Sequence, residues 1–136
     1  MKKYENFRSQ LAVLRKARDE DLQNEFVVSG IINKFALQFE LSWKVLKETL
    51  AYEGVALAAS GSPREVLKAA FATYGFIDED VWLEMLKARN DLAQVYDGNA
   101  ARVMVDRIVG VYVPAFSRLE NGLDELYAGV LFVSRR

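Results

Sequence analysis

Four polar side chains with hydrogen-bonding capacity lie within one short stretch of the chain: Arg89, Asn90, Gln94 and Tyr96. If this stretch is helical, Arg89 and Tyr96 share a face over two turns, and Asn90 and Gln94 share the adjacent face. The four groups would then converge near the end of one helix and could bind a ligand there. A structural interpretation competes with this one and is favoured by the residues alone: an Arg with its charge satisfied, and a Tyr at the edge of a helical bundle.

Most other catalytic chemistry is excluded by composition, because the 136 residues include no His and no Cys. Histidine general bases, Ser-His and Cys-His pairs, thiolate zinc sites and disulfides are therefore absent. The sequence also has no glycine-rich phosphate loop. Its carboxylates do not repeat at helical spacing on an apolar face, so we expect no metal site and no cofactor.

The charge balance predicts no general attraction to nucleic acid or to anionic membranes, since 18 basic and 19 acidic residues leave a net charge of −1. The N-terminus lacks the apolar core of a signal peptide. No apolar run approaches the roughly 20 residues that span a bilayer. We therefore expect a cytoplasmic protein that does not enter the membrane.

The longest element that the pattern predicts is a helix from Asn24 to Glu53, about 43 Å long at 1.5 Å per residue. It carries two apolar rows at steps of three and four residues: Val28, Ile31, Phe35, Phe39, Trp43, Leu46 and Leu50 in the first, and Ile32, Leu37, Leu41 and Val45 in the second. Two rows indicate burial on two sides, either at the centre of a bundle or between a core and a partner. Glu40, Lys44 and Glu48 form a polar edge between them.

The remaining sequence predicts four further helices around this one. The first covers Lys3 to Arg18 and precedes the acidic turn Asp19-Glu20-Asp21, where Asp21 or Asn24 can cap the long helix. A capping box at Ser62-Pro63-Arg64-Glu65 starts a short helix that ends near Tyr74. We expect this short helix to bury Val66, Leu67, Ala70 and Phe71.

Two predicted helices complete the chain. Asp78-Glu79-Asp80 opens a helix that runs through Tyr96 and is broken by Asp97-Gly98-Asn99. The last helix extends from Asn99 to Tyr127, with a kink expected at Pro114 because its ring would crowd the carbonyl of Gly110.

These elements predict the fold class, since no strand-like alternation, internal repeat or low-complexity tract appears. We expect residues 1–136 to form a single domain. Short connections between helices favour antiparallel neighbours. The prediction is therefore an all-α, up-and-down four-helix bundle with one additional short helix.

Three segments carry a resemblance to a known family, in order and at matching spacing: FELSWKVLKETLAYEG, GSPREVLKAAF, and WLEMLKARN followed by Tyr96. They are similar to the nucleotidyltransferase substrate-binding family of the HEPN superfamily, which is related to HepT-type toxins. The resemblance implies a HEPN-like helical bundle that homodimerises. It also implies binding to a minimal nucleotidyltransferase encoded nearby, with a nucleotide or RNA as a further ligand.

The resemblance also bears on the polar stretch. HEPN domains carry an Arg, then four to six residues, then a His that is often followed by x-Tyr. Here Arg89, Asn90 and Tyr96 fall on those positions, but Gln94 occupies the His position. In active members Arg and His from two chains meet at the dimer interface and cleave RNA, and a Gln cannot exchange a proton as His does.

The missing His makes a non-catalytic binding subunit the favoured hypothesis and leaves two alternatives open. The first is a HepT-like toxin ribonuclease in which Arg89 holds phosphate and some other group acts as base. The second places Tyr96 as the acceptor of AMP from the nucleotidyltransferase, as the toxin–antitoxin members of the family imply.

Overall fold

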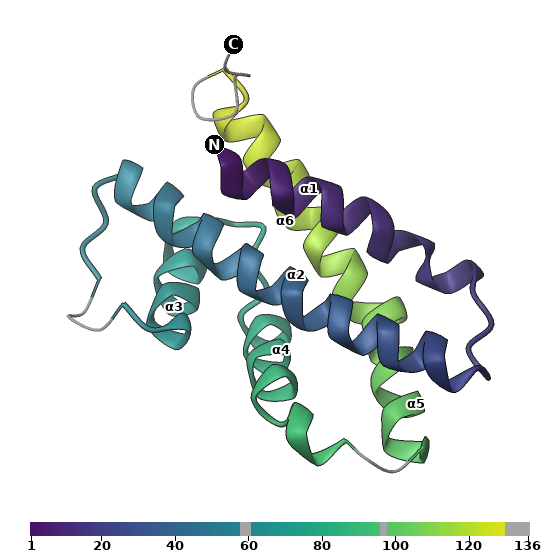
Figure 1. The fold of residues 1–136 in the computed structure, drawn as a ribbon. Coiled ribbons are helices and arrows are strands. Elements are labelled where there is room, and N and C mark those ends of the chain that lie inside the picture. Colours follow the sequence, from purple (N-terminus) through teal and green to yellow (C-terminus); the bar gives the residue numbers. More distant parts are fainter. Residues whose placement is uncertain (58–60, 96–97, 130–136) are drawn as a thin grey trace.

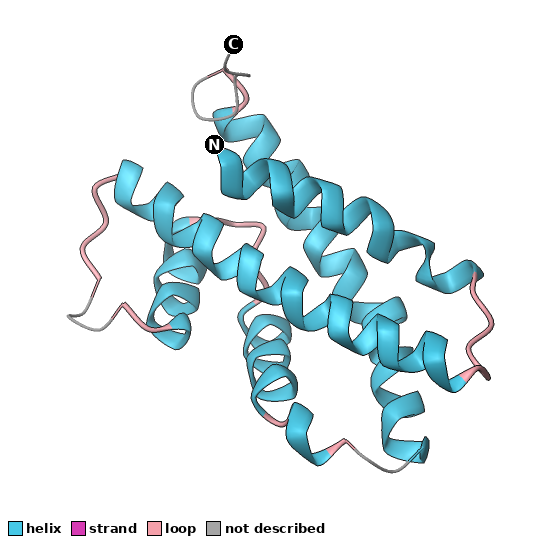
Figure 2. Cartoon of the chain, viewed as in Figure 1, coloured by secondary structure: helices cyan, strands magenta, loops and turns pink. Residues whose placement is uncertain are grey.

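The computed structural model describes residues 1–57, 61–95 and 98–129, and within these ranges every regular element is helical (Figure 2). The described residues form six α-helices (Figure 1): α1 (Lys2–Leu14), α2 (Glu25–Tyr52), α3 (Pro63–Thr73), α4 (Glu79–Asn90), α5 (Gly98–Arg107) and α6 (Val113–Tyr127). Two 3₁₀ segments, Arg15–Asp19 and Leu92–Gln94, and one π-helical turn, Ile108–Tyr112, continue α1, α4 and α5. The all-α prediction is confirmed.

The helix starts follow the capping residues in the sequence. The side chain of Asn24 accepts hydrogen bonds from the N–H groups of Phe26 (2.8 Å) and Val27 (3.3 Å). Of the two predicted capping residues, Asp21 and Asn24, it is therefore Asn24 that caps α2. The capping box of α3 is also present: Ser62 Oγ accepts from the N–H of Glu65, whose carboxylate accepts from the N–H of Ser62. Each cap satisfies backbone donors that the first turn of a helix leaves unpaired.

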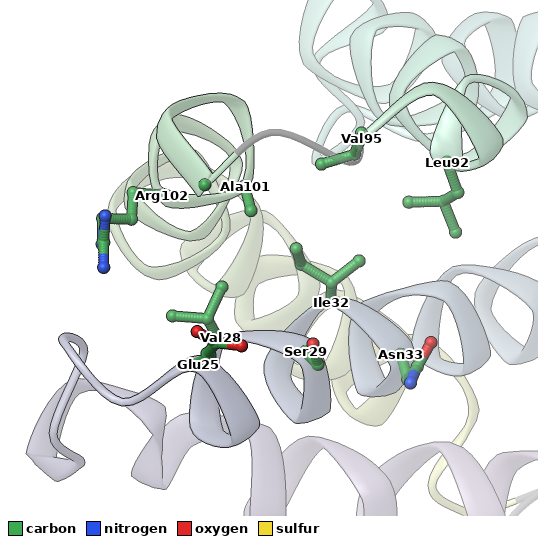
Figure 3. A pocket seen from close by; sticks show the side chains of 10 residues that line it. Glu25, Val28, Ser29, Ile32, Asn33, Leu92, Val95, Ala101 and Arg102 are labelled. Carbon is green, nitrogen blue, oxygen red and sulfur yellow. The ribbon is translucent and has the colours of Figure 1, made fainter.

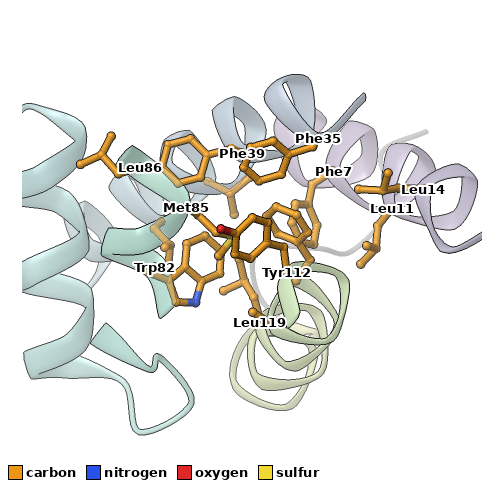
Figure 4. Packing of buried hydrophobic residues seen from close by; sticks show 14 of the residues in the cluster. Phe7, Leu11, Leu14, Phe35, Phe39, Trp82, Met85, Leu86, Tyr112 and Leu119 are labelled. Atoms are coloured by element: carbon orange, nitrogen blue, oxygen red, sulfur yellow. The ribbon is translucent and has the colours of Figure 1, made fainter. Parts of the chain in front are cut away.

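The long helix α2 lies at the centre of the molecule, with α1 and α6 on one side and α3, α4 and α5 around the other (Figure 1). Its first apolar row meets an aromatic cluster contributed by the other helices (Figure 4). The ring of Phe35 stacks on Tyr112 at 5.1 Å between centroids, and Phe39 lies 6.3 Å from Trp82. These rings are fully or almost fully buried. Each contributes on the order of 2 kcal/mol by leaving water.

The second apolar row of α2 is only partly covered. Val45 is buried and both Ile32 and Leu41 are half-buried, but 46% of Leu37 is exposed. Phe26, in the first turn of α2, is 85% exposed. The prediction that Phe71 of α3 is buried is wrong, because 48% of it is exposed. Its neighbours Val66, Leu67 and Ala70 already fill the face of α3 that meets the core.

The last predicted helix is divided in two by a π-helical turn over Ile108–Tyr112, which ends two residues before Pro114. Proline has no N–H to donate, and its ring crowds the carbonyl four residues earlier. A wider turn at this point moves that carbonyl away, and α6 leaves α5 in a changed direction (Figure 1). The interruption was predicted at this proline; its form, a π turn, was not.

Candidate functional site

The polar stretch of the sequence lies at the end of α4, which stops at Asn90, earlier than predicted. Asp91 takes up φ −94° and ψ 8°, and a 3₁₀ turn over Leu92–Gln94 follows. Asn and Asp side chains compete with the helical backbone for hydrogen bonds, which explains why the helix ends at Asn90-Asp91. The expectation that Asn90 and Gln94 share one helix face is therefore wrong.

Arg89 is held by the protein's own groups. Its Nη2 forms an ion pair with Oε2 of Glu40 on α2, and its Nη1 donates a hydrogen bond of 3.2 Å to Oδ1 of Asn90. Oε1 of Glu40 also lies 3.8 Å from Nζ of Lys44. The Arg89 and Glu40 side chains are only 32% and 25% exposed, so their charges attract each other more strongly than a surface pair does. The guanidinium predicted to meet a ligand therefore connects α4 to α2.

The other predicted site residues form fewer hydrogen bonds and are more exposed than Arg89. Asn90 is exposed beside Arg89, so the structure brings these two together. Gln94 is exposed in the 3₁₀ turn, and its side chain forms no hydrogen bond to any of the residues described. Tyr96 lies outside the described residues. Glu40 was not singled out as a site residue; the one sequence signal was a carboxylate on the polar edge between two apolar rows.

A cavity of about 380 Å³ lies next to this stretch, between the first half of α2, the 3₁₀ turn and the start of α5 (Figure 3). Its apolar walls come from all three segments: Val28, Ile32, Leu92, Val95 and Ala101. Its polar groups come from two helices: Glu25, Ser29, Asn33 and Arg102. Arg89, Asn90 and Gln94 do not line it, so the cavity and the polar stretch are neighbouring but separate features.

A second charged cluster connects α4 to the π-helical turn. Glu84 accepts two hydrogen bonds from Arg107 (2.9 and 2.7 Å) and one from the Tyr112 hydroxyl (2.6 Å). Partial burial raises the pKa of Glu84, but the hydrogen bonds from Tyr112 and Arg107 outweigh it and hold that pKa below its ordinary value. Burial, followed by the hydrogen bond to Glu84, raises the pKa of Tyr112 well above its ordinary value. This cluster fixes the turn against α4.

The described part of the chain holds no group of three or more acidic side chains arranged to bind a metal ion. Gln94 has no titratable proton, and among the described residues Glu40 is the only charged group paired with Arg89 across the helices. The arrangement can hold α2 and α4 together and can present hydrogen-bonding groups at the surface.

Comparison with known protein families identifies the family to which the chain belongs. The profile of the family described as "Nucleotidyltransferase substrate binding protein like" matches residues 2–125. The chain belongs to this family. The match spans most of the 136 residues and includes Arg89, Asn90, Gln94 and Tyr96. No curated protein matches the chain.

Membership of the nucleotidyltransferase substrate-binding family gives the chain a binding role in general terms: it binds a partner or a substrate. Among the described residues, no helix is both long enough and apolar enough to cross a membrane. Helix α2 is long enough, but it carries charged side chains at Glu25, Lys34, Glu40 and beyond.

Proposed function

We propose that this protein is a non-catalytic subunit that binds a separate minimal nucleotidyltransferase encoded nearby. The observation that carries the proposal is the family match over residues 2–125, which covers nearly the whole helical structure. The resemblance of the polar stretch to the HEPN motif, with Gln94 in place of His, agrees with binding without catalysis.

The contacts of Arg89 support a binding role over a ribonuclease role. A phosphate that approached Arg89 would have to compete with the carboxylate of Glu40, which already occupies the guanidinium. RNA cleavage by a general acid and base also needs a group that exchanges protons near neutral pH, and the chain contains no His. The retained Arg89 and Asn90 then serve to fix the end of α4.

The outward face of α2 supports a protein partner. Phe26 (85% exposed) and Leu37 (46% exposed) are eleven residues apart, close to three full helical turns, so both point to the same side of α2. Exposed apolar side chains on one face are typical of surfaces that a partner covers. We assign this face to protein contacts, with a second copy of the chain in a homodimer and the nucleotidyltransferase as the two partners.

One alternative keeps the toxin–antitoxin arrangement of the resemblance. Arg89, Asn90 and Tyr96 all occupy their motif positions, which favours a role for Tyr96 as an AMP acceptor. The phenol oxygen would attack the α-phosphate of ATP on the nucleotidyltransferase, pyrophosphate would leave, and the phenol proton would pass to solvent.

Association is the test of the proposal. The purified chain is mixed with the nucleotidyltransferase encoded beside it, and the mass of the mixture is measured by size exclusion with light scattering. We expect a single species that contains both proteins and no cleavage of added RNA. Separate elution of the two proteins over the micromolar range, or RNA cleavage that Arg89→Ala abolishes, would refute the proposal.

A further inference from the structure

A groove of about 380 Å³ lies where the end of α3 and the start of α4 meet α6, and we call it the α3–α6 groove. We propose that residues 130–136 of the same chain dock in it, with Phe132 on its aromatic side chains and Arg135 and Arg136 at its carboxylates. The proposal goes beyond the partner-binding role above and does not depend on it, because the groove and its occupant belong to one chain.

The apolar wall of the α3–α6 groove contains two aromatic side chains that contact water. Phe71 is 48% exposed and Phe76 is half-buried, and both line the groove. Leu126, which is 54% exposed, follows Gly122 by four residues on α6, so it lies on the side of α6 where Gly122 meets the Phe76 ring. The three side chains form an apolar path from the end of α6 to α3. Exposed apolar surface of this kind is typical of a face that another segment covers.

Carboxylates border the α3–α6 groove at the start of α4. Asp78, Glu79 and Asp80 all line it. Asp78 and Asp80 are exposed, and Glu79 forms an ion pair of 3.1 Å with Lys68. Arg118 lines the groove as well, but the three carboxylates outnumber its single positive charge. The groove therefore suits an occupant that combines apolar and basic side chains.

Residues 130–136 have this combination. They lie outside the described part of the chain, and their sequence is VLFVSRR, an apolar run followed by a serine and two arginines. The apolar run matches the aromatic path, and the arginines match the carboxylates beyond it. Such charge complementarity selects one docking surface among several and fixes the direction of the segment along it.

The segment also starts close to the groove. The hydroxyls of Tyr127 and Tyr74 lie 2.9 Å apart, and the Tyr74 ring stacks on Phe76 at 5.1 Å. Gly122, beside Phe76, is about 10 Å from Gly129 along α6 at 1.5 Å per residue. Seven extended residues span about 23 Å, so the segment can turn back along α6 and cover Phe76. A tether this short also favours the groove of the same chain over that of a second copy.

Disulfide formation between two introduced cysteines tests the contact, because the chain has no Cys of its own. The full chain carries Gly75→Cys together with Val133→Cys. Gly75 is exposed, lines the groove and has no atom within 4 Å of an added Cβ. Oxidised glutathione is the oxidant and takes up the two electrons that the thiols lose. We expect an intramolecular disulfide, which intact mass shows as a monomer that has lost two hydrogen atoms.

The matched control is Glu5→Cys together with Val133→Cys. Glu5 is exposed and follows Tyr4, whose hydroxyl donates to Asp124 of α6 at 2.6 Å. It therefore also lies near the end of α6, but it belongs to α1 and does not line the groove. If the segment docks, the disulfide should form about tenfold faster at Gly75 than at Glu5.

Two substitutions in the Gly75/Val133 cysteine pair test the chemistry of the contact. Phe132→Ser should slow the intramolecular disulfide about tenfold, as loss of a buried Phe predicts. Asp80→Asn should slow it at low salt and have less effect at high salt, because ions screen exposed charges. Asp78 stays intact, since its side chain caps α4.

Amide chemical shifts of the chain without introduced cysteines give a second readout. Phe132→Ser should move the resonances of Phe71 and Phe76 and leave those of Phe26 on α2 unchanged. Four results would overturn the proposal: equal disulfide rates at Gly75 and Glu5, a disulfide-linked dimer as the main product, no slowing by Phe132→Ser, or unchanged resonances in the groove. Because the nucleotidyltransferase is absent, none of these results would affect the association test above.

Discussion

Arg89 and Glu40, 49 residues apart in sequence, form an ion pair that joins the end of α4 to the middle of α2. The pair gives Arg89 a structural role, since it holds two helices together. Arg89, the charged residue of the polar stretch, therefore contacts other residues of the fold.

The first prediction concerns the stability supplied by this pair. Glu40→Gln leaves Arg89, a side chain only 32% exposed, without its countercharge. We expect the free energy of unfolding to fall by about 1–2 kcal/mol, between the values for exposed and buried pairs. Urea unfolding measures the change.

The control for the Arg89–Glu40 pair is a more exposed pair at the C-terminal end of α4. Lys87 and Asp91 are 78% and 42% exposed, so Lys87→Ala should cost less than about 0.5 kcal/mol. A double-mutant cycle of Glu40→Gln with Arg89→Gln should give a coupling energy of about 1 kcal/mol. A coupling near zero would show that the contact does not stabilise the fold.

A second prediction concerns acid pH and Glu84. The folded-state pKa of Glu84 lies below its unfolded value, so ionised Glu84 stabilises the fold above that unfolded value, near 4.5. The stabilisation is lost as pH falls through the lower folded pKa. Glu84→Gln should therefore be less stable than the wild type at pH 7, and the difference should shrink between pH 5 and pH 3. Urea titrations at several pH values measure it, and a constant difference would contradict the assignment.

A third prediction uses the close approach of α6 to Phe76. A Cβ at Gly122 would lie 2.5 Å from Cγ of Phe76, whose ring stacks on Tyr74 at 5.1 Å. Gly122→Ala should therefore destabilise the protein by about 1–3 kcal/mol through displacement of this ring, despite the better helix propensity of Ala.

The matched control for Gly122 is Gly30, which is also inside a helix but has no neighbour within 4 Å of an added Cβ. Gly30→Ala should stabilise the protein by about 0.5–1 kcal/mol. Thermal unfolding of both variants gives the comparison. Equal shifts in the same direction would show that Phe76 does not constrain this site.

A fourth prediction concerns the outward face of α2. Phe26 is 85% exposed, so Phe26→Ser should leave the unfolding temperature nearly unchanged but weaken association with the partner about tenfold or more. Leu126→Ser, which alters a side chain 54% exposed on α6, is the control and should leave association intact. Light scattering over a concentration series measures both. If both variants weakened association equally, the outward face of α2 would not be the specific contact face.

Local sequence features predicted much of the fold. Asn24 and Ser62 cap their helices because the capping chemistry depends on residues two or three positions away, which the sequence displays directly. The aromatic positions of α2, Phe35 and Phe39, were identified by their spacing. The family, too, was recognised from local motifs, and the match over residues 2–125 confirms it.

The errors arose where distant parts of the chain decide the outcome. Phe71 has core chemistry, but its face of α3 meets solvent. The early end of α4 is a local exception, because at Asn90-Asp91 helix and turn compete closely and the sequence does not show which conformation wins. The partner of Arg89 could not be read from the sequence, because Glu40 comes from another helix. The same is true of the cavity at Arg102, which three separate segments build.

Native mass spectrometry of the chain mixed with its neighbouring nucleotidyltransferase, Mg²⁺ and ATP tests the central claim most directly. The account predicts a stable complex that contains both proteins, with the intact mass of this chain unchanged. An AMP adduct that disappears in Tyr96→Phe would contradict the simple binding role and make the chain a substrate of its partner. Two separate proteins at every concentration tested would contradict the proposed association itself.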